Sequence, residues 1–533
     1  MTEAVAEKSW GQTLLAFLHP RVVTMLFLGF SAGVPILLIF SSLGLWLSEA
    51  GVSKSAVTFF SWAALGYSFK FVWAPLVDKM PLPIVTKLLG RRRSWMLLSQ
   101  VMVIVAILLM AFTDPSLSDK SLTVMALAAV LLGFSSATQD VVIDAYRIES
   151  ANSDLQALMS STYIAGYRIG MIVAGAGALY IAHYFGSEKE AYNYDAWMTA
   201  YVVMAGAMLV GVITTLTIPE PDAYQANQLS YQTSDYARFF LMFVLSVLSF
   251  VAVFFISSKS GVNFGVGPLY ETVQSAKASL TEVFANKRLA SLLVETIRLC
   301  LALIAAWGVA KLMIRAKMVN ESMVKESYIS PVRDFFARYG MTLAILLLCL
   351  VGFYRVSDIV LGAIANIFYQ DIGYTKVDIA TVSKLFGLLA TIAGGFIGGI
   401  LAVRYGVMRI LFLGAVLSAL TNLLFIWLSQ SELDIVNLYV VITADNLSAG
   451  LASAAFIAFL SSLTNISFTA VQYAIFSSLM TLFPKVLGGY SGTFVESMGY
   501  TNFFIMTTLL TLPILVLILV AGKYFKGTVK MAK

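Results

Sequence analysis

Long apolar segments, separated by short polar ones, run through almost the whole of this 533-residue chain. Since a helix needs roughly 20 apolar residues to cross the hydrocarbon core of a bilayer, about fourteen of the segments are long enough to do so. They cover residues 22–47, 55–77, 95–113, 121–147, 156–184, 196–218, 237–257, 289–313, 341–369, 377–401, 407–428, 437–463, 468–490 and 501–522. The pattern predicts an all-α, polytopic membrane protein with about 14 spans.

Composition agrees with this prediction and excludes several classes of protein. Apolar residues make up 59% of the chain, charged residues 12%, and the mean hydropathy is +0.85, whereas soluble domains are roughly 45 to 50% apolar. The formal charge of +6 is scattered over connecting segments, so we expect no nucleic-acid surface. Cys300 and Cys349 both lie in apolar segments, which excludes a disulfide framework or a cysteine zinc site, and we expect no cofactor or metal.

Lys and Arg are unevenly distributed among the segments that connect the spans. If the N-terminus is cytoplasmic, the cytoplasmic segments hold about 20 of these residues and the outer ones about nine. The deciding clusters are Lys79, Lys87, Arg91, Arg92 and Arg93 after the second span, and Lys523, Lys526, Lys530 and Lys533 at the tail. We therefore expect both termini in the cytoplasm. The first apolar segment is too long for a signal-peptide core, so we expect no cleavage.

Polar connectors divide the chain into three parts. We expect an N-terminal six-helix bundle at 1–219, an insert with two extra transmembrane helices and a cytoplasmic connector at 220–340, and a C-terminal six-helix bundle at 341–533. About 30 residues between the two extra helices fit either an amphipathic surface helix or a plain loop. Within the insert, Glu295 and Arg298 are spaced to neutralise one another on one helix.

Ionisable residues inside the predicted spans, together with two amide side chains, are the candidates for function. The first half holds Lys70, Asp140, Asp144, Tyr167 and Arg168, and the second half holds Arg355, Asp358, Lys384, Asp445, Asn446 and Gln472. A charge stranded at membrane depth costs roughly 3 kcal/mol, so eight of them would exceed the roughly 5 to 15 kcal/mol stability of a protein. These groups therefore line a shared cavity or form ion pairs between helices, and the sequence leaves both readings open.

Two short polar turns, one in each half, repeat a pattern of glycine and arginine at a helix end. Asp78 and Gly90 to Arg93 follow the second span, and Gly398, Gly399, Arg404 and Arg409 follow its counterpart in the later half. Cations at helix ends can bridge the two halves of a transporter. We therefore expect Lys70, Asp78, Arg91, Arg92, Arg93 and Arg404 to act in gating. Gly166 and Gly170 are spaced to let a neighbouring helix approach closely.

The order and the residues of these motifs resemble those of the AmpG-type muropeptide permeases of the major facilitator superfamily. The matching segments are 69–78 with 90–93, 137–140, 166–170, 354–358, 387–392, 445–447 and 472–474, and the similarity extends over nearly the whole chain outside 220–340. The long insert and Val471, where relatives commonly have threonine, depart from the family's pattern.

The resemblance implies two six-helix bundles and the import of anhydromuropeptides from the periplasm across the bacterial inner membrane. In the family this uptake serves peptidoglycan recycling, is linked to β-lactamase induction, and is thought to use the proton gradient. The carboxylates and amides of such a substrate suit Arg168, Tyr167, Arg355, Lys384, Asn446 and Gln472, and Asp140, Asp144, Asp358 and Asp445 are the candidates for proton coupling. We expect a monomer in the lipid bilayer whose partners are the substrate and protons.

Several other functions fit parts of the sequence. A related branch of the superfamily carries acetyl-coenzyme A, and a channel or flippase tolerates similar charges. An intramembrane enzyme is disfavoured because no HExxH motif or convincing nucleophile and base pair occurs, and the two histidines, His19 and His183, lie near span ends. A primary pump is disfavoured because the chain has no P-loop motif.

Overall fold

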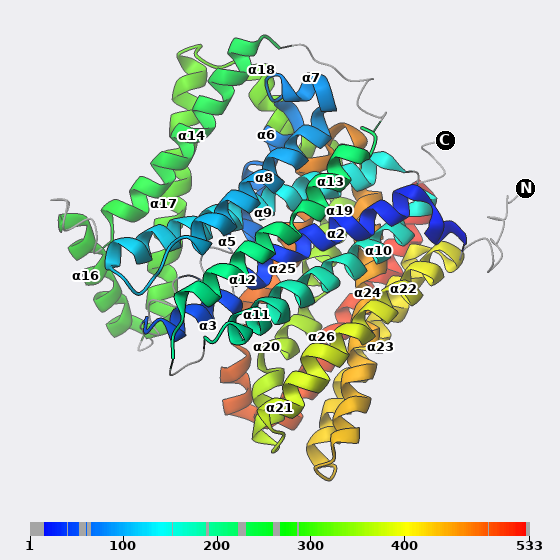
Figure 1. The fold of residues 1–533 in the computed structure, drawn as a ribbon. Helices are drawn as coiled ribbons and strands as arrows, with labels where there is room; N and C mark the ends of the chain where they lie inside the picture. Colours follow the sequence, from blue (N-terminus) through cyan, green and yellow to red (C-terminus); the bar gives the residue numbers. More distant parts are fainter. Residues whose placement is uncertain are drawn as a thin grey trace, which may run out of the picture. The chain divides into compact units, whose positions relative to one another are not determined.

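The computed structural model of the protein describes residues 15–39, 41–52, 60, 65–151, 153–187, 191–221, 231–258, 267–284, 287–488 and 490–528. The chain divides into two compact units (Figure 1): unit 1 is Met1–Asn227 with Arg333–Lys533, and unit 2 is Gln228–Val332. Unit 2 lies within the predicted insert at 220–340. Both predicted bundles fall in unit 1, so their division into two domains stays a prediction; we call them the N-terminal and C-terminal halves.

The described part of the N-terminal half is built from helices alone. They are η1 Ala16–Leu18, α2 Pro20–Ile39, α3 Ser41–Glu49, α5 Leu65–Phe69, η3 Lys70–Val72, α6 Ala74–Lys79, α7 Val85–Leu89, α8 Arg91–Ala111, α9 Asp119–Ser150, α10 Ser153–Ile172, η4 Val173–Gly177, α11 Ala178–Tyr184, α12 Tyr194–Ala207 and α13 Leu209–Thr217. Several of these helices begin at a polar residue whose side chain accepts a hydrogen bond from a free N–H group of the first turn. Ser118 caps α9 in this way, and Asn193 caps α12.

The C-terminal half continues in the same style. It contains α19 Ser330–Phe353, α20 Val356–Asp371, α21 Lys376–Ile379, η7 Ala380–Phe386, α22 Gly387–Tyr405, α23 Val407–Gln430, α24 Ile435–Leu463, η8 Ile466–Phe468, α25 Thr469–Gly488 and α26 Ser491–Thr528. Two of these helices are interrupted by glycines with positive φ, α19 at Gly340 and α26 at Gly499. Glycine adopts this conformation readily because it has no Cβ.

Thirteen helices in the described part of the chain are long and apolar enough to cross a membrane, and each overlaps one of the predicted spans. The remaining prediction, 55–77, falls partly outside the described residues. Its described part is divided among α5, η3 and α6. Pro75 stands in the first turn of α6, where the lack of an N–H costs nothing because first-turn N–H groups have no partner within the helix. A helix that continued from the preceding segment would need that N–H, so the proline favours a new helix start here.

Unit 2 contains a hairpin of two long helices and a third helix between them. The elements are α14 Thr233–Ile256, α16 Gly267–Phe284, α17 Lys287–Arg315, α18 Glu321–Val324 and η6 Lys325–Ile329. Of the two readings left open for the connecting segment, α16 realises the helical one. The predicted pairing within α17 is confirmed, because Arg298 Nη1 lies 2.8 Å from Glu295 Oε2. Lys277 of α16 joins this pair at 2.8 Å from Glu295 Oε1.

Glycines bring α2 and α10 of the N-terminal half into backbone contact along a seam. A Cβ on Gly166 or Gly170 would lie 1.9 Å from the carbonyl oxygen of Leu26 or 2.2 Å from that of Phe30. The contact is reciprocal, because a Cβ on Gly33 of α2 would lie 2.0 Å from the Tyr167 oxygen. The close approach predicted from the spacing of Gly166 and Gly170 is therefore confirmed.

Within unit 1, the two halves contact each other through a few helices. α10 packs against α22 and α24, and α25 packs against α5, η3, α6 and α9. Ala470, Val471 and Ala474 of α25 belong to a hydrophobic cluster whose other buried members all come from the N-terminal half. The described polar contacts between the halves involve the ends of α6, α9, α24 and η8 and the start of α25. We call this end of unit 1 the Arg92 end.

Candidate functional site

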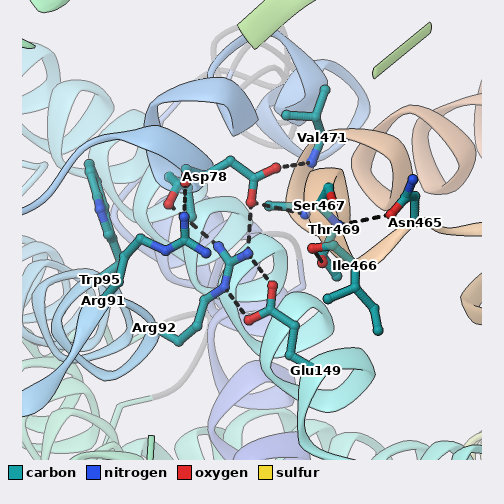
Figure 2. Close-up of polar contacts among 12 residues, drawn as sticks. Asp78, Arg91, Arg92, Trp95, Glu149, Asn465, Ile466, Ser467, Thr469 and Val471 are labelled. Carbon is teal, nitrogen blue, oxygen red and sulfur yellow. Dashed lines mark hydrogen bonds and ion pairs between the residues drawn. The ribbon is translucent and has the colours of Figure 1, made fainter. Parts of the chain in front are cut away.

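The first turn of α8 gathers three consecutive arginines at the Arg92 end. Gly90, with φ +85°, turns the chain into the helix directly before them. Arg92 is 1% exposed and lies between two carboxylates, with Nη2 at 2.7 Å from Asp78 Oδ1 and 2.5 Å from Glu149 Oε1 (Figure 2). Its Nε donates to Glu149 Oε2 at 2.9 Å. A cation at a helix N-terminus opposes the helix dipole, so these two anions are what make its burial tolerable.

Asp78 connects this cluster to the other half of unit 1. Its carboxylate accepts the backbone N–H of Ala470 on Oδ1 at 3.2 Å and that of Val471 on Oδ2 at 3.0 Å. These are free N–H groups of the first turn of α25, where the helix dipole favours an anion. Figure 2 shows the carboxylate between the Arg92 guanidinium and the start of α25. Asp78 therefore caps a helix of the C-terminal half while it neutralises an arginine of the N-terminal half.

The neighbouring arginines hold the surrounding backbone. Arg91 donates to the main-chain oxygen of Asp78, and Arg93 donates to the oxygens of Thr215 at 2.9 Å and Leu216 at 2.7 Å. Glu220 caps α8 itself, accepting the N–H of Arg92 at 2.7 Å and that of Arg93 at 3.0 Å. Burial raises the pKa of the Glu220 carboxyl above its ordinary value, although these hydrogen bonds act in the opposite direction.

A second set of buried charges lies on α9 and η3. Asp144 is paired with Lys70, whose Nζ is 3.9 Å from Oδ2, and with Arg147, whose Nη2 is 3.3 Å from Oδ1. Asp140 lies one turn away and is 8% exposed, and its Oδ1 has no hydrogen-bond partner among the described residues. The two aspartates lie on one face of α9 but differ in their ion pairs. Asp144 pairs with two cations, whereas Asp140 has no cation at ion-pair distance among the described residues.

The C-terminal half holds a corresponding set. Arg355 lies at the break between α19 and α20, with Nε 3.3 Å from Asp358 Oδ2, and its Nη1 donates to Ser453 Oγ at 2.7 Å. Ser418 donates to the other oxygen of Asp358. Asp445 accepts only a long hydrogen bond, 3.5 Å from Thr421 Oγ1, among the described residues. Asn446, one residue further on, accepts from Thr391 Oγ1 at 2.9 Å.

Two arginines from opposite halves, Arg168 of α10 and Arg355, repel each other electrostatically. The side chain of Arg355 is 24% exposed. Within the described part of the chain Arg168 has no ion-pair partner, and its recorded hydrogen bond is a weak one to Met171 Sδ at 3.7 Å. Tyr167 is next to Arg168, with its ring 6.1 Å from that of Tyr163. Among the described residues, Asp358 pairs with Arg355 and no carboxylate pairs with Arg168, so one positive charge inside the predicted spans is left without an ion-pair partner.

The remaining predicted residues lie elsewhere. Gln472 is 1% exposed and bonds protein groups at the Arg92 end: its Nε2 donates to Asp334 Oδ2 at 2.9 Å, and its Oε1 accepts from Arg338 at 3.1 Å and from the Asn465 N–H at 2.7 Å. Arg404 lies over the ring of Tyr405, 5.5 Å from its centroid. Lys384 belongs to η7, but its side chain is outside the described residues.

Comparison with known proteins identifies the family. A profile described as Major Facilitator Superfamily matches residues 22–481 of this chain. The chain belongs to the major facilitator superfamily. This membership confirms the predicted fold class and makes the protein a membrane transporter, not an enzyme. The solved proton:xylose symporter XylE has the superfamily fold in common with it, with a TM-score of 0.53, 11% identity, and coverage of 97% of this chain and 96% of that one.

The relatives within the superfamily also confirm the resemblance seen in the motifs. A putative transporter AmpG 4 of Rickettsia conorii is 29% identical over 499 residues, which are 94% of this chain and 96% of the relative. The anhydromuropeptide permease of Escherichia coli K12 is 27% identical over 518 residues, 97% of this chain and 83% of the relative. The fold alone is also similar to that of a bacterial homologue of the iron transporter ferroportin, solved in an outward-facing state, with a TM-score of 0.55, 9% identity, and coverage of 94% of this chain and 98% of that one.

Several residues of this superfamily transporter were missed by sequence reasoning. Arg147, Glu149 and Glu220 are central to the polar contacts described above, and Asp334 and Arg338 hold Gln472. All five lie at ends of predicted spans or in predicted connectors, where charges are ordinary. The available signal was the spacing of Arg147 to Asp144 at i,i+3 and of Arg338 to Asp334 at i,i+4, which places each pair on one helix face.

Proposed function

We propose that this transporter imports anhydromuropeptides from the periplasm to the cytoplasm of a bacterium in symport with protons, for cell-wall recycling. The observation that supports the substrate is the similarity to the Escherichia coli anhydromuropeptide permease over 97% of this chain. The protein acts as a monomer in the inner membrane, with both termini in the cytoplasm. Reporter fusions to each terminus test the orientation, since only a cytoplasmic end gives a fluorescent fusion to a cytosol-folding protein.

The substrate's carboxylate binds between Arg168 and Arg355 in this proposal. The repulsion between the two guanidinium groups and the absence of a described acidic partner for Arg168 support an anion between them. Tyr167 provides a ring beside this position, and Asn446 and Lys384 belong to the neighbouring helices of the C-terminal half. Gln472 has its amide engaged by Asp334 and Arg338, so it would reach substrate only after the Arg92 end opens.

The proton binds to Asp140 or Asp445. Each is an intramembrane carboxyl without a cation at ion-pair distance among the described residues, whereas Asp144 and Asp358 have cations at 3.3 Å. A carboxyl that lies inside a membrane span and lacks a cation partner is the one whose neutral form is favoured. Asp144 and Asp358 then stay charged and hold the cations in place.

The gate is the cluster of Asp78, Arg91, Arg92 and Arg93. With the N-terminus in the cytoplasm, the Arg92 end is the cytoplasmic end, and the capping of α25 by Asp78 holds it closed. The halves then await substrate from the periplasm, and opening requires the bonds of Asp78 to Ala470 and Val471 to break. Lys70 acts deeper, through Asp144, and Arg404 acts at the matching turn of the C-terminal half.

Uptake by the purified protein in proteoliposomes tests the proposal. Labelled anhydromuropeptide should accumulate when the outside is made acidic, and a protonophore should abolish accumulation. Excess unlabelled anhydromuropeptide should compete, whereas acetyl-coenzyme A should not. Accumulation that survives the protonophore refutes proton coupling, and equal competition by acetyl-coenzyme A refutes the substrate assignment.

A further inference from the structure

Arg147 is a fully buried arginine in the last turn of α9 that contacts both halves of unit 1. Its side chain is 0% exposed, and it stands near the C-terminal end of α9. One of its terminal nitrogens, Nη2, is 3.3 Å from Asp144 in the same helix. The other, Nη1, donates to Gln156 Oε1 and Ser160 Oγ of α10, each at 3.2 Å. These contacts fix the guanidinium within the N-terminal half.

The same guanidinium also reaches the C-terminal half. Nη1 donates to Ser461 Oγ of α24 at 2.7 Å, the shortest of its contacts, and the group lies over the ring of Tyr473 of α25, 5.3 Å from its centroid. A cation on an aromatic face and a hydroxyl acceptor both stabilise a positive charge, more so where water is excluded. Both partners leave Arg147 if the halves separate at this end, whereas Asp144, Gln156 and Ser160 move with it.

The charge of Arg147 is not fully compensated by its own half. Asp144 is the carboxylate at ion-pair distance from Arg147 among the described residues, and it is shared with Lys70. The Nε of Arg147 is buried without a hydrogen-bond partner in the same part of the chain. A buried charge with an unused donor is costly. The contacts from Ser461 and Tyr473 therefore supply stabilisation that the N-terminal half lacks, and they supply it only while the halves are closed.

From this geometry we infer that Arg147 is a positioning residue that holds the closed contact between the halves through Ser461 and Tyr473, and ties it to the buried charges around Asp144. The inference rests on the proposed alternating-access function, because the contact is relevant only to a carrier whose halves separate. This contact is additional to that of Asp78. Its arginine lies on α9, about two turns from the candidate proton-binding Asp140, instead of on the connecting turn.

A single cysteine on α25 reports the contact. In a Cys300→Ser, Cys349→Ala background, Ala474→Cys places a thiol at a position that is 1% exposed and packed against the N-terminal half. A membrane-permeant maleimide labels it only when the halves separate there. Arg147→Gln should raise the labelling rate by about tenfold or more, since a charge-assisted hydrogen bond is lost from the closed state alone. Arg147→Lys, which keeps the charge, should restore part of the protection.

Arg298→Gln is the matched control. Arg298 has the same kinds of partner as Arg147, namely an i,i+3 glutamate at 2.8 Å, a serine hydroxyl at 2.9 Å and an aromatic ring at 5.0 Å, but all of them lie in unit 2. Its replacement should leave the labelling of the Ala474→Cys thiol unchanged. In a double-mutant cycle, Ser461→Ala should accelerate labelling in the parent background and add little to Arg147→Gln.

The readouts separate a positioning role from a structural one. Arg147→Gln should also lower the maximal rate of net uptake more than it raises KM, because closure and not substrate contact is affected. Unchanged labelling of the thiol at position 474 in folded Arg147→Gln protein, or full additivity with Ser461→Ala, overturns the inference. Labelling is measured without substrate, so failure of anhydromuropeptide uptake would refute the proposed function while leaving this test intact.

Discussion

Replacing Asp78 by asparagine tests whether the two halves are held together at the Arg92 end by a helix cap. The substitution preserves the shape of the side chain but removes the charge that faces the first turn of α25 and the Arg92 guanidinium. Arg92 keeps its two contacts with Glu149, at 2.5 and 2.9 Å, so its buried charge stays neutralised and the fold should survive.

The expected magnitude follows from the bonds that are lost. Hydrogen bonds to a charged group contribute about 1.5 to 3 kcal/mol, so Asp78→Asn should shift the equilibrium between closed and open states roughly 10- to 150-fold towards open. The contact belongs to the closed state only, and the shift should therefore appear as faster opening.

Hydrogen exchange measured by mass spectrometry detects this faster opening. Peptides covering 465–475 should exchange faster in the variant, because the amides of Ala470 and Val471 lose their acceptor. Asp434→Asn is the matched control, since Asp434 caps α24 within a single half, accepting the Val436 N–H at 2.9 Å. If Asp78→Asn leaves exchange at 465–475 at the parent level, the cap does not hold the halves together and the reasoning fails.

Three further predictions concern other parts of the molecule. Arg168→Gln should raise KM for anhydromuropeptide uptake by about tenfold or more, through loss of a charge-assisted bond to substrate, and an unchanged KM would contradict the proposed carboxylate site. Gly33→Ala should lower the midpoint of thermal unfolding, at a cost of about 1 to 3 kcal/mol, because its Cβ would lie 2.0 Å from the Tyr167 oxygen; a parental midpoint would count against the seam. Burial raises the pKa of Glu220, so the stability that its protonated form adds is complete below pH of about 4.3 and is lost as the pH rises through the raised value. In Glu220→Gln protein, the midpoint of thermal unfolding should fall less as the pH rises through this range. An identical fall in both proteins would refute the raised pKa of Glu220.

The sequence predicted the spans well because membrane insertion imposes a local constraint. Every predicted span with a fully described counterpart recurs as a helix, and the glycine spacing of 166 and 170 correctly indicated a close helix contact. Asp78, Arg91 and Arg92 were expected from the sequence to act together in gating; the structure places them in contact, and their role in gating stays a prediction.

Contacts between segments far apart in the chain could not be predicted from the sequence, because they depend on how the helices pack. Arg147 was unremarkable as a basic residue at the end of a span, and only the packing of the two halves gives it Ser461 of α24 and Tyr473 of α25 as partners. Asp334 and Arg338 were assigned to a connector, yet they belong to α19 and hold Gln472. The difference between Asp140 and Asp144 likewise depends on where Lys70 lies in three dimensions, which spacing along one helix does not determine.

The glycine seam between α2 and α10 has a mechanical consequence. Carbonyl oxygens of each helix occupy the space that side chains would fill on the other. Neither helix can therefore slide or rotate without a steric clash, and the pair moves as one rigid unit. Any swing of the N-terminal half must then carry Arg168 and the α10 partners of Arg147 along together. Movement between the halves takes place where α10 meets α22 and α24 and where α25 meets α5, η3, α6 and α9.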